Sequence, residues 1–412
     1  LGRNIGAYLE LLRSGRVRID ELHSQTFSLA QAGSAFEALA RSSEKLTLAF
    51  LEYGPREAKG YATKVTVARH KELSLPTPRD KKTVGVGVIG ASSFFLSTHM
   101  PILKAHPERF SLVSICSKQP AKAESVRRQY QFAESTTDFR DVIDNPDVDL
   151  ILVMTRHDLH GGLARKAVEA GKHVFLEKPL TIFPDELRWF GERFIKDAGE
   201  ALLSVGFNRR FSPAAEAIRE KVRHRQAPLV INYRVSAGRL PQDHWIYGEE
   251  GGGRNLGEAC HFYDFFIAMT GALPEKIAVM PGSANEPTDC FSVSMKMTDG
   301  SLCNLVYFDS GSRHIGKESI DVSWDGRTVT VDDFRSVTEN KSRRFGRFRQ
   351  DKGFSSQWDH LYRAVLESRP LTPLAEVLAS AEASFEVESV LRGTSHSPPV
   401  SNPQVRREKG NP

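Results

Sequence analysis

The sequence predicts an α/β protein in which a Rossmann-type domain with a parallel sheet precedes an α+β domain with an open, mainly antiparallel sheet. Between residues 83 and 206, short apolar strands alternate with helical stretches, the pattern of βαβ units. After residue 207, Asp-Gly pairs separate alternating strands, which is typical of hairpins. With 412 residues, 40% of them hydrophobic, the chain is long enough for two or three domains.

The first large domain, residues 83–206, is expected to bind a dinucleotide. Its buried strands appear as short apolar runs, because a parallel sheet is covered on both faces. Strands are predicted at 84–89, 112–116, 150–155, 173–176 and 202–206, and helices at 101–105, 121–130 and 162–170.

The second large domain, residues 207–392, is expected to bind the substrate and to form the oligomer interface. Its hairpin turns are Asp299-Gly300 and Asp325-Gly326. Strands are predicted at 228–235, 290–297, 302–308, 320–324 and 328–331, and helices at about 255–270, around 358–365 and at 374–391. The Trp358 helix carries an apolar stripe that we interpret as core packing. Residues 393–412 are rich in Ser, Pro, Arg and Lys, and we expect a disordered tail.

We expect a short αβ segment at residues 1–55. It is followed by a polar linker at residues 56–82, which contains Pro76 and Pro78. The αβ segment contains a helix at 5–12, a strand at 25–27, a helix at 29–39 and a strand at 46–51. It is too small for a good core of its own. The chain begins at Leu1 with a helix-like pattern, so we expect a fragment of a longer protein.

Composition argues against several classes of protein. Fifty-six Lys and Arg residues against 51 Asp and Glu give a net charge of +5, too small an excess to indicate nucleic-acid binding. No apolar run approaches the roughly 18 residues of a membrane helix. The four cysteines are scattered in apolar stretches, which predicts free thiols in the core and a cytoplasmic location.

A turn after the first strand of the Rossmann-type domain is the candidate cofactor loop, with Gly90, Ala91, Ser92 and Phe94 as candidate ligands. A helix that begins after such a turn offers free N–H groups to a pyrophosphate. Only Gly90 of the G-x-G-x-x-G pattern is present. Ser92 and Phe95 replace the other two glycines, and we expect lost space and, at Ser92, backbone strain.

The end of the second strand bears on the choice of cofactor. It lacks the acidic residue that would bind the ribose hydroxyl of NAD. Ser117 and Lys118 stand there instead. They either accept the 2′-phosphate of NADP or are plain loop residues, and NADP is slightly favoured over NAD.

Glu177 and Lys178 follow the strand at 173–176, at the sheet edge where open α/β sheets bind ligands. A lysine at this edge can polarise a substrate hydroxyl or carbonyl group, and a nearby positive charge or burial would lower its pKa. The alternative is a solvated loop residue.

Four motifs in order resemble the Gfo/Idh/MocA oxidoreductase family over residues 83–392. They are the Thr155–His160 turn, Glu177-Lys178-Pro179, the segment 206–213 and the segment 251–264. Residues 1–55 resemble the end of a medium-chain, zinc-type alcohol dehydrogenase domain, and some members of the family are fused behind such a domain.

The family resemblance implies hydride transfer between NAD(P) and a sugar, an inositol-like polyol or a related hydroxyl or carbonyl substrate. It implies a polarising role for Lys178 and an acid/base role for His261. It places Thr155, His157 and His160, with Glu177, along the nicotinamide and ribose. It directs Arg209 and Arg210 toward the substrate. It also implies a homo-oligomer that is formed through the open sheet. Trp245 either walls the substrate pocket or packs in the core.

One departure from the family pattern concerns the acid four residues before the histidine, where this chain has Gly257. Glu258 is adjacent but points about 100° around the helix, and it is retained as a candidate catalytic residue. With the altered glycine loop, this departure motivates an alternative, a non-catalytic nucleotide- or sugar-binding regulatory protein that keeps the fold.

Two other patterns have competing interpretations. Glu258-x-x-His261 has the spacing of metal ligands, but no second such pair exists, so we expect no metal site. The basic segment 341–352 would suit phosphate or nucleic acid. We favour a solvated loop, since charge is balanced elsewhere, and expect neither a nucleic acid nor a membrane as partner.

Overall fold

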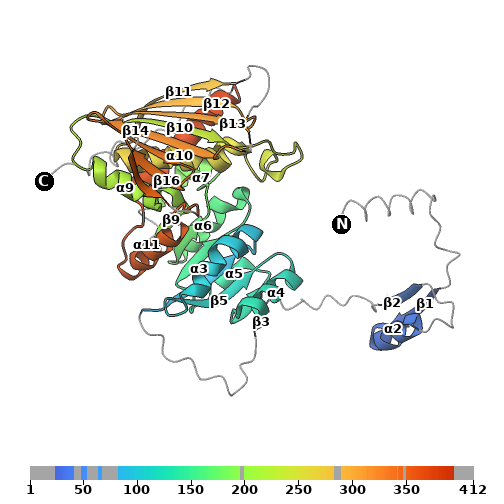
Figure 1. Ribbon diagram of the computed structural model, residues 1–412. Coiled ribbons are helices and arrows are strands. Elements are labelled where there is room, and N and C mark those ends of the chain that lie inside the picture. Colours follow the sequence, from blue (N-terminus) through green and yellow to red (C-terminus); the bar gives the residue numbers. More distant parts are fainter. Residues whose placement is uncertain are drawn as a thin grey trace. The chain divides into compact units, whose positions relative to one another are not determined.

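The structure is a computed structural model that describes residues 24–40, 48–52, 64–66, 82–194, 199–282, 289–312, 314–340, 342–346 and 349–393. The chain divides into two compact units, Leu1–Ala62 and Thr63–Pro412 (Figure 1). The helix predicted at 5–12 and the tail predicted at 393–412, apart from Gly393, lie outside the described residues.

The smaller unit contains a βαβ element. Its parts are β1 (Ser24–Ser28), a 3₁₀ turn η1 (Leu29–Gln31), α2 (Ala32–Ala40) and β2 (Leu48–Glu52). The two strands pair in parallel, as the crossover through a helix requires. The strands and the helix predicted between residues 25 and 51 are therefore confirmed.

The larger unit contains a seven-stranded sheet in the order β3-β6-β5-β4-β7-β8-β9. Its strands are β3 (Lys64–Thr66), β4 (Val84–Ile89), β5 (Phe110–Cys116), β6 (Glu134–Thr136), β7 (Leu150–Val153), β8 (His173–Leu176) and β9 (Leu203–Val205). All pairs are parallel except β3 with β6. The segment predicted as a link thus contributes an antiparallel edge strand, β3.

Helices cover both faces of this parallel sheet, which explains why every residue of β4 is buried. The helical elements are the π-helical turn η2 (Phe95–His99), α3 (Met100–Ala105), α4 (Pro120–Tyr130), α5 (Phe139–Ile143), α6 (His160–Glu169) and α7 (Pro184–Glu192). The strand order reverses between β4 and β7, where open α/β sheets bind ligands.

The second sheet has eight strands in the order β11-β12-β13-β10-β14-β15-β16-β17. They are β10 (Val230–Ser236), β11 (Pro274–Pro281), β12 (Phe291–Met297), β13 (Leu302–Phe308), β14 (Glu318–Trp324), β15 (Arg327–Asp332), β16 (Ser336–Glu339) and β17 (Ser342–Gly346). Only β10 and β13 pair in parallel, so the mainly antiparallel sheet is confirmed. Both Asp-Gly turns lie where predicted, but the solvated loop favoured at 341–352 is wrong in part, since β17 occupies it.

One face of the second sheet is covered by α9 (Pro213–Val222), α10 (Cys260–Thr270) and α12 (Leu374–Leu391), which supply the core residues beneath the strands (Figure 1). Helix α10 is buried almost all round, which fits its run of aromatic and aliphatic side chains. A π-helical turn, η6 (Asn255–Ala259), leads into it. The predicted helix at about 255–270 is therefore confirmed.

Helix α11 (Phe354–Leu366) follows the second sheet in sequence but packs on the first domain. Trp358, Leu361 and Val365 are buried with Phe110 and Phe175 of the parallel sheet. The apolar stripe is therefore core, as predicted. The contact also brings the loop before α11 close to the ends of the parallel strands.

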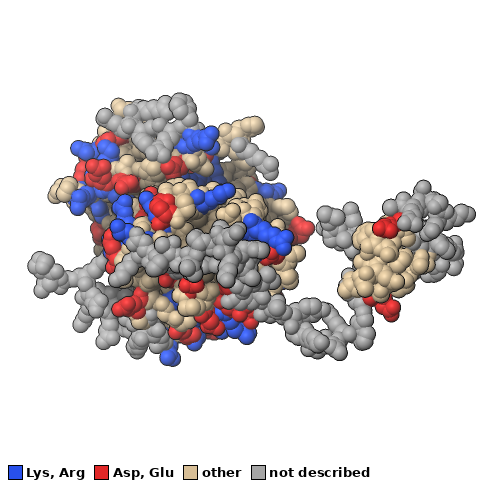
Figure 2. Space-filling model, turned by 90° about the horizontal axis from the view of Figure 1, so that it is seen from below, with Lys and Arg blue, Asp and Glu red and all other residues tan. Residues whose placement is uncertain are grey.

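The surface and the cysteines agree with the composition. Acidic and basic side chains are interspersed on the face of the larger unit seen in Figure 2. Cys116, Cys260 and Cys303 are free and buried, as predicted, whereas Cys290 is only half-buried. Within the residues it describes, the structure contains no helix both long and apolar enough to cross a membrane.

Candidate active site

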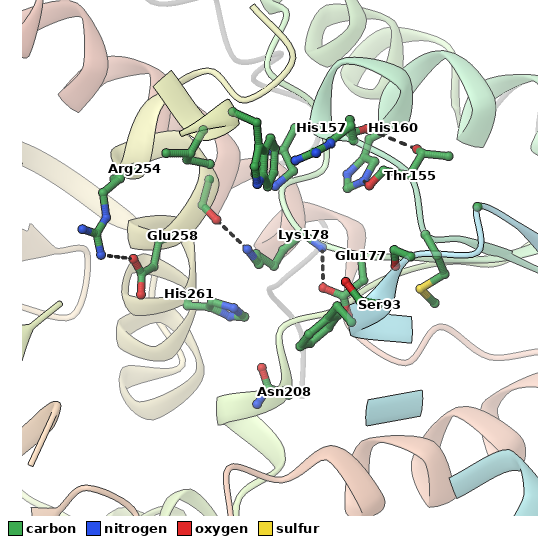
Figure 3. Close-up of a pocket in the computed structure, with 18 of the residues that line it drawn as sticks. Ser93, Thr155, His157, His160, Glu177, Lys178, Asn208, Arg254, Glu258 and His261 are labelled. Atoms are coloured by element: carbon green, nitrogen blue, oxygen red, sulfur yellow. Dashed lines mark hydrogen bonds and ion pairs between the residues drawn. The ribbon is translucent and has the colours of Figure 1, made fainter. Parts of the chain in front are cut away.

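A cavity of about 820 Å³ opens where the carboxyl ends of β4, β7 and β8 meet the second domain (Figure 3). Most of the predicted site residues line it. They are Gly90, Ala91, Ser92, Phe94, Thr155, His157, His160, Glu177, Lys178, Arg209, Trp245, Glu258 and His261. Ser117, Lys118 and Arg210 are not among the lining residues.

The glycine-poor turn after β4 is built without strain. Gly90 has φ of +106°, and a Cβ there would lie 2.6 Å from the carbonyl oxygen of Met154, so only glycine fits. Ser92 does not have a positive φ. Its Oγ accepts a hydrogen bond from the N–H of Phe95 at 3.2 Å, as a helix N-cap does. The strain expected at Ser92 is therefore not found.

The turn fits the pyrophosphate of a dinucleotide. Ser93 and Phe94 form the first helical turn and line the cavity, and N–H groups of a first turn have no partner within the helix. Phe95, in place of a small residue, is fully buried in the core and leaves the cavity open. Beyond β5, Lys122 in the first turn of α4 lines the cavity, whereas Lys118 does not. A basic residue shortly after the second strand was the sequence signal for a phosphate ligand. The sequence alone did not show whether Lys118 or Lys122 lines the cavity.

Glu177 is a fixed anion at the floor of the cavity. Its Oε1 lies 2.9 Å from Nε2 of the buried His99, whose Nδ1 accepts a hydrogen bond from the indole N–H of Trp358 at 3.0 Å. That bond leaves the proton on Nε2, which donates to Glu177. Burial opposes ionisation, but the bond from His99 and the charge of Lys178 keep the pKa of Glu177 below its usual value.

Lys178 reaches across the cavity from the end of β8 (Figure 3). Its Nζ donates to the carbonyl oxygen of Gly257 at 2.6 Å. An ammonium group has three N–H bonds, so two remain for a ligand. Within the described residues no carboxylate lies at ion-pair distance from this ammonium group.

The missing acid at position 257 has a steric explanation. A Cβ at Gly257 would lie 2.7 Å from Cε1 of His157 and 2.7 Å from Cδ1 of Ile246. The imidazole of His157 therefore takes the space that a side chain at 257 would need. No carboxylate can occupy that position unless His157 moves.

His157 and His160 are both buried, and burial keeps the pKa of each imidazole low. Nδ1 of His157 donates to the carbonyl oxygen of Gly251 at 2.8 Å, and Nδ1 of His160 to that of Pro179 at 2.8 Å. Burial, followed by the charge of Lys178, lowers the pKa of His157 to about 2, and burial lowers that of His160. His160 thereby fixes the segment that carries Lys178.

His261 lies opposite Lys178, on the first turn of α10 (Figure 3). The residue is 6% exposed, and its Nδ1 has no hydrogen-bond partner within the described part of the chain. Burial and the charges of Arg209 and Lys178 lower its pKa well below the usual value. A buried polar atom without a partner is costly, so His261 is poised to bond a ligand.

Glu258 lines the cavity, but its carboxylate is engaged. It pairs with Lys317, accepts from Arg254 at 2.9 Å and from the hydroxyl of Tyr307 at 2.6 Å. Although burial opposes ionisation, Lys317 and Arg254 lower its pKa to about 2. The side chain points toward these partners, as the offset around the helix predicted, and two cations already neutralise it.

Glu258 should contribute an acid-sensitive part of the stability. Its pKa falls from 4.5 in the unfolded chain to about 2 in the folded one, so its stabilisation is present above about pH 4.5 and is lost as the pH falls to about 2. The loss amounts to about 3 kcal/mol as an upper bound. We expect Glu258→Gln to flatten the fall in urea-unfolding free energy over this range. An unchanged slope would contradict the assignment.

Arg209 and Arg210, which were both expected to face the substrate, lie in different places. Arg209 lines the cavity, but its guanidinium binds both oxygens of Glu318 at 2.6 and 2.8 Å. Arg210 pairs instead with the buried Asp264 and with Glu376. Arg210 therefore does not meet the expectation that it faces the substrate, because two carboxylates hold it in the interior.

Trp245 does wall the cavity. The guanidinium of Arg156 lies 3.9 Å from its ring centre, and the ring of His157 packs against it edge-on. Trp245 is only half-buried and is therefore not a core residue; its contact with a substrate stays a prediction.

Several lining residues were not predicted. Asn208, Arg254 and Lys352 line the cavity. Arg254 lies one helical turn before Glu258, a spacing that could have signalled the pair. Lys352 belongs to the basic segment favoured as a solvated loop, yet its ammonium bonds Glu318 at 2.6 Å. No local pattern signals a contact of that kind.

The fold and site define a two-domain protein with a Rossmann-type nucleotide-binding domain. Residues 84–207 match the family GFO_IDH_MocA, described as an oxidoreductase family with an NAD-binding Rossmann fold. This match supports the resemblance that the four motifs indicated. A fusion behind a zinc-type dehydrogenase domain is not part of the match.

Similar proteins and solved structures agree with this family match. The scyllo-inositol 2-dehydrogenase (NAD(+)) of Bacillus subtilis (strain 168) is 28% identical over 203 residues, 48% of this chain and 57% of that protein. A levoglucosan dehydrogenase of Pseudarthrobacter phenanthrenivorans is 31% identical over 120 residues, 29% of this chain and 30% of that protein. The matches thus span 57% of the length of the first of these relatives and 30% of the second. A solved levoglucosan dehydrogenase in complex with NADH and levoglucosan has a TM-score of 0.66 at 17% identity, covering 75% of this chain and 98% of that one, and shows the shared fold.

Proposed function

We propose that the chain is a Gfo/Idh/MocA-type oxidoreductase that transfers hydride between NAD(P) and a hydroxyl or carbonyl group of a sugar or polyol. One observation carries the proposal. Lys178 from the parallel sheet and His261 from the second domain line the same cavity as the turn at Gly90. The names of the relatives, which are inositol and levoglucosan dehydrogenases, support the substrate class.

The chain's own residues account for the proton and for substrate orientation. A bound nicotinamide supplies the hydride chemistry. In the oxidation direction, Lys178 donates a hydrogen bond to the substrate oxygen and stabilises the negative charge that develops there. His261, held neutral by burial and nearby cations, accepts the hydroxyl proton. Glu177 and His160 keep Lys178 in position.

For the cofactor, the residues that fit are Ser93 and Phe94 at the pyrophosphate and Thr155 beside the ribose and nicotinamide. Lys122, which lines the cavity, would be the cation available to a phosphate on the ribose. The relatives include scyllo-inositol dehydrogenases named for NAD(+) and for NADP(+). We propose NADP ahead of NAD, because no acidic residue follows β5 directly.

A substrate screen tests the proposed reaction. Purified protein is incubated with inositols, levoglucosan and common aldoses in the presence of NADP⁺ or NAD⁺, and the absorbance of reduced nicotinamide is followed. We expect turnover with at least one substrate and none with His261→Ala. Absence of turnover with wild-type protein that binds the dinucleotide would favour the alternative, a non-catalytic binding protein. The missing carboxylate at Gly257 is the observation in favour of that alternative.

We propose that the open sheet forms a homo-oligomer. Its outer face exposes neighbouring apolar side chains on β10 and β13, with Val230 40%, Leu302 49% and Val306 49% exposed. The double variant Leu302→Lys/Val306→Lys should be monomeric by light scattering, whereas Leu366→Lys, at an exposed site on α11, should not change the assembly. A monomeric wild-type protein would refute this proposal.

We also propose that residues 1–55 are the end of a medium-chain dehydrogenase domain and that the protein is cytoplasmic. The parallel β1–β2 pair joined through α2 supports the first part, since such domains are built from βαβ units. The coding sequence upstream of Leu1 should encode the rest of that domain, and fractionation of cells should recover the protein in the cytoplasm.

A further inference from the structure

We propose that the cavity takes a substrate that carries an anionic group, a carboxylate or a phosphate, and that Arg209 and Lys352 bind this group. The inference rests on the proposed function and narrows its substrate class. Neither residue belongs to the pair that handles the reacting oxygen, Lys178 and His261.

Arg209 and Lys352 share a single carboxylate. Arg209 binds both oxygens of Glu318, and Lys352 donates to Oε1 of the same residue at 2.6 Å. The hydroxyl of Tyr233 also donates to Glu318 at 2.6 Å. Glu318 is fully buried, and the side chains of Arg209 and Lys352 are only 7% and 17% exposed. Two cations against one anion leave one positive charge in excess beside the cavity.

Contacts with the turn at 208–211 hold Lys352 beside the cavity. Gly353 has φ of +88°, and a Cβ on it would lie 2.6 Å from the carbonyl oxygen of Asn208. The side-chain amide of Asn208 donates to the carbonyl oxygen of Lys352 at 2.8 Å. The loop before α11 therefore packs directly on the turn that carries Arg209.

The other charges around His261 do not compensate this excess. Arg254 and Lys317 are matched by Glu258 and Asp289, so that cluster is neutral. Lys178 adds a further positive charge, whose ammonium bonds a carbonyl oxygen. Glu177, next to Lys178, offsets that charge, so the sum is an excess of one positive charge, that of Arg209 and Lys352 against Glu318. Uncompensated buried charge is costly, and an anionic ligand would offset it.

The dinucleotide does not account for Arg209 and Lys352. Its pyrophosphate is expected at the first helical turn after Gly90, on the parallel-sheet domain. Arg209 and Lys352 are instead anchored on Glu318, which begins β14 of the second sheet. Together with the unpartnered Nδ1 of His261, they form the wall that a substrate would contact.

Binding rather than turnover tests the inference, so that its failure is distinct from failure of the proposed reaction. Calorimetry compares D-glucuronate and a glucose monophosphate with neutral D-glucose and myo-inositol, with and without saturating NADPH. We expect at least one anionic probe to bind about tenfold or more tightly than its neutral counterpart. The carboxylate and phosphate probes distinguish the two possible sources of charge.

A variant that removes the charge of Lys352 tests whether this residue causes the preference for anionic probes. Lys352→Met should weaken binding of the anionic probe by about 10- to 100-fold, the effect of losing a hydrogen bond to a charged group, and leave the neutral probes unchanged. Lys352→Arg should restore most of the affinity. Lys104→Met, at an exposed lysine on α3, is the matched control and should bind like wild type.

Lys352→Met leaves Glu318 paired with Arg209 and Tyr233, so we expect it to fold, and its circular dichroism and melting temperature check this. Anionic probes that bind no better than neutral ones, or not at all, would overturn the inference. So would an equal loss for both kinds of probe in Lys352→Met, because the two cations would then serve only to stabilise Glu318.

Discussion

Lys178→Met is expected to lower turnover by roughly 100- to 10,000-fold, the usual contribution of a positioned proton donor or acceptor. The ammonium group bonds one protein atom, the carbonyl oxygen of Gly257, and leaves two N–H bonds for the substrate. Loss of that single bond should cost only about 1 kcal/mol of stability. Initial rates and thermal unfolding of the purified variant measure the two effects separately.

The control for this prediction is Lys104→Met, which makes the same chemical change at an exposed lysine on α3 and should keep full activity. Dinucleotide binding by Lys178→Met should also persist, because the turn at Gly90 is untouched. An active Lys178→Met protein would show that the lysine takes no part in the reaction. The solvated-loop interpretation of this residue would then be preferred.

Arg210→Met is expected to lower the free energy of unfolding by about 3–5 kcal/mol, the cost of leaving a buried charge without its partner. Arg210 donates to Asp264 at 2.7 and 3.0 Å and to Glu376 at 2.9 Å. The side chain of Asp264 is fully buried. These contacts join the turn at 208–211 to α10 and α12, so the loss should be seen in urea unfolding.

The matched control is Arg239→Met, which removes an arginine whose side chain is 78% exposed and should change stability by less than about 1 kcal/mol. Arg210→Met/Asp264→Leu removes both charges and should recover part of the loss. If Arg210→Met instead kept its stability and raised only the KM for substrate, the role first expected for Arg210 would be correct and its structural role would not.

The sequence predicted the strands that have a strong pattern and missed those that do not. Strands β4, β5, β7, β8 and β9 are apolar runs, and Asp-Gly turns mark the β12–β13 and β14–β15 hairpins, so these were found. The buried parallel strand β6, with the sequence Glu-Ser-Thr, was missed. Strand β3 has three residues, Lys-Val-Thr, and β17 contains two arginines. Such edge strands are defined by pairing with a neighbour, and nothing within the segment indicates it.

The candidate site could be predicted where it lies in contiguous motifs. Lys178, His157 and His261 were found in this way, and all three line the cavity. The buried ion pair between Arg209 and Glu318 joins residues 109 positions apart, and no local pattern signals it. The steric link between Gly257 and His157 likewise requires the folded chain.

Binding of NADPH and NADH to the purified protein tests the central claim most directly. Trp245 lines the cavity beside His157, so intrinsic tryptophan fluorescence should report occupancy. We predict saturable quenching by both nucleotides, with NADPH the tighter ligand, and weaker binding when Ser93 is replaced by proline, which has no N–H to offer a phosphate. A folded sample that binds neither nucleotide would contradict the assignment of this chain as a nicotinamide-dependent oxidoreductase.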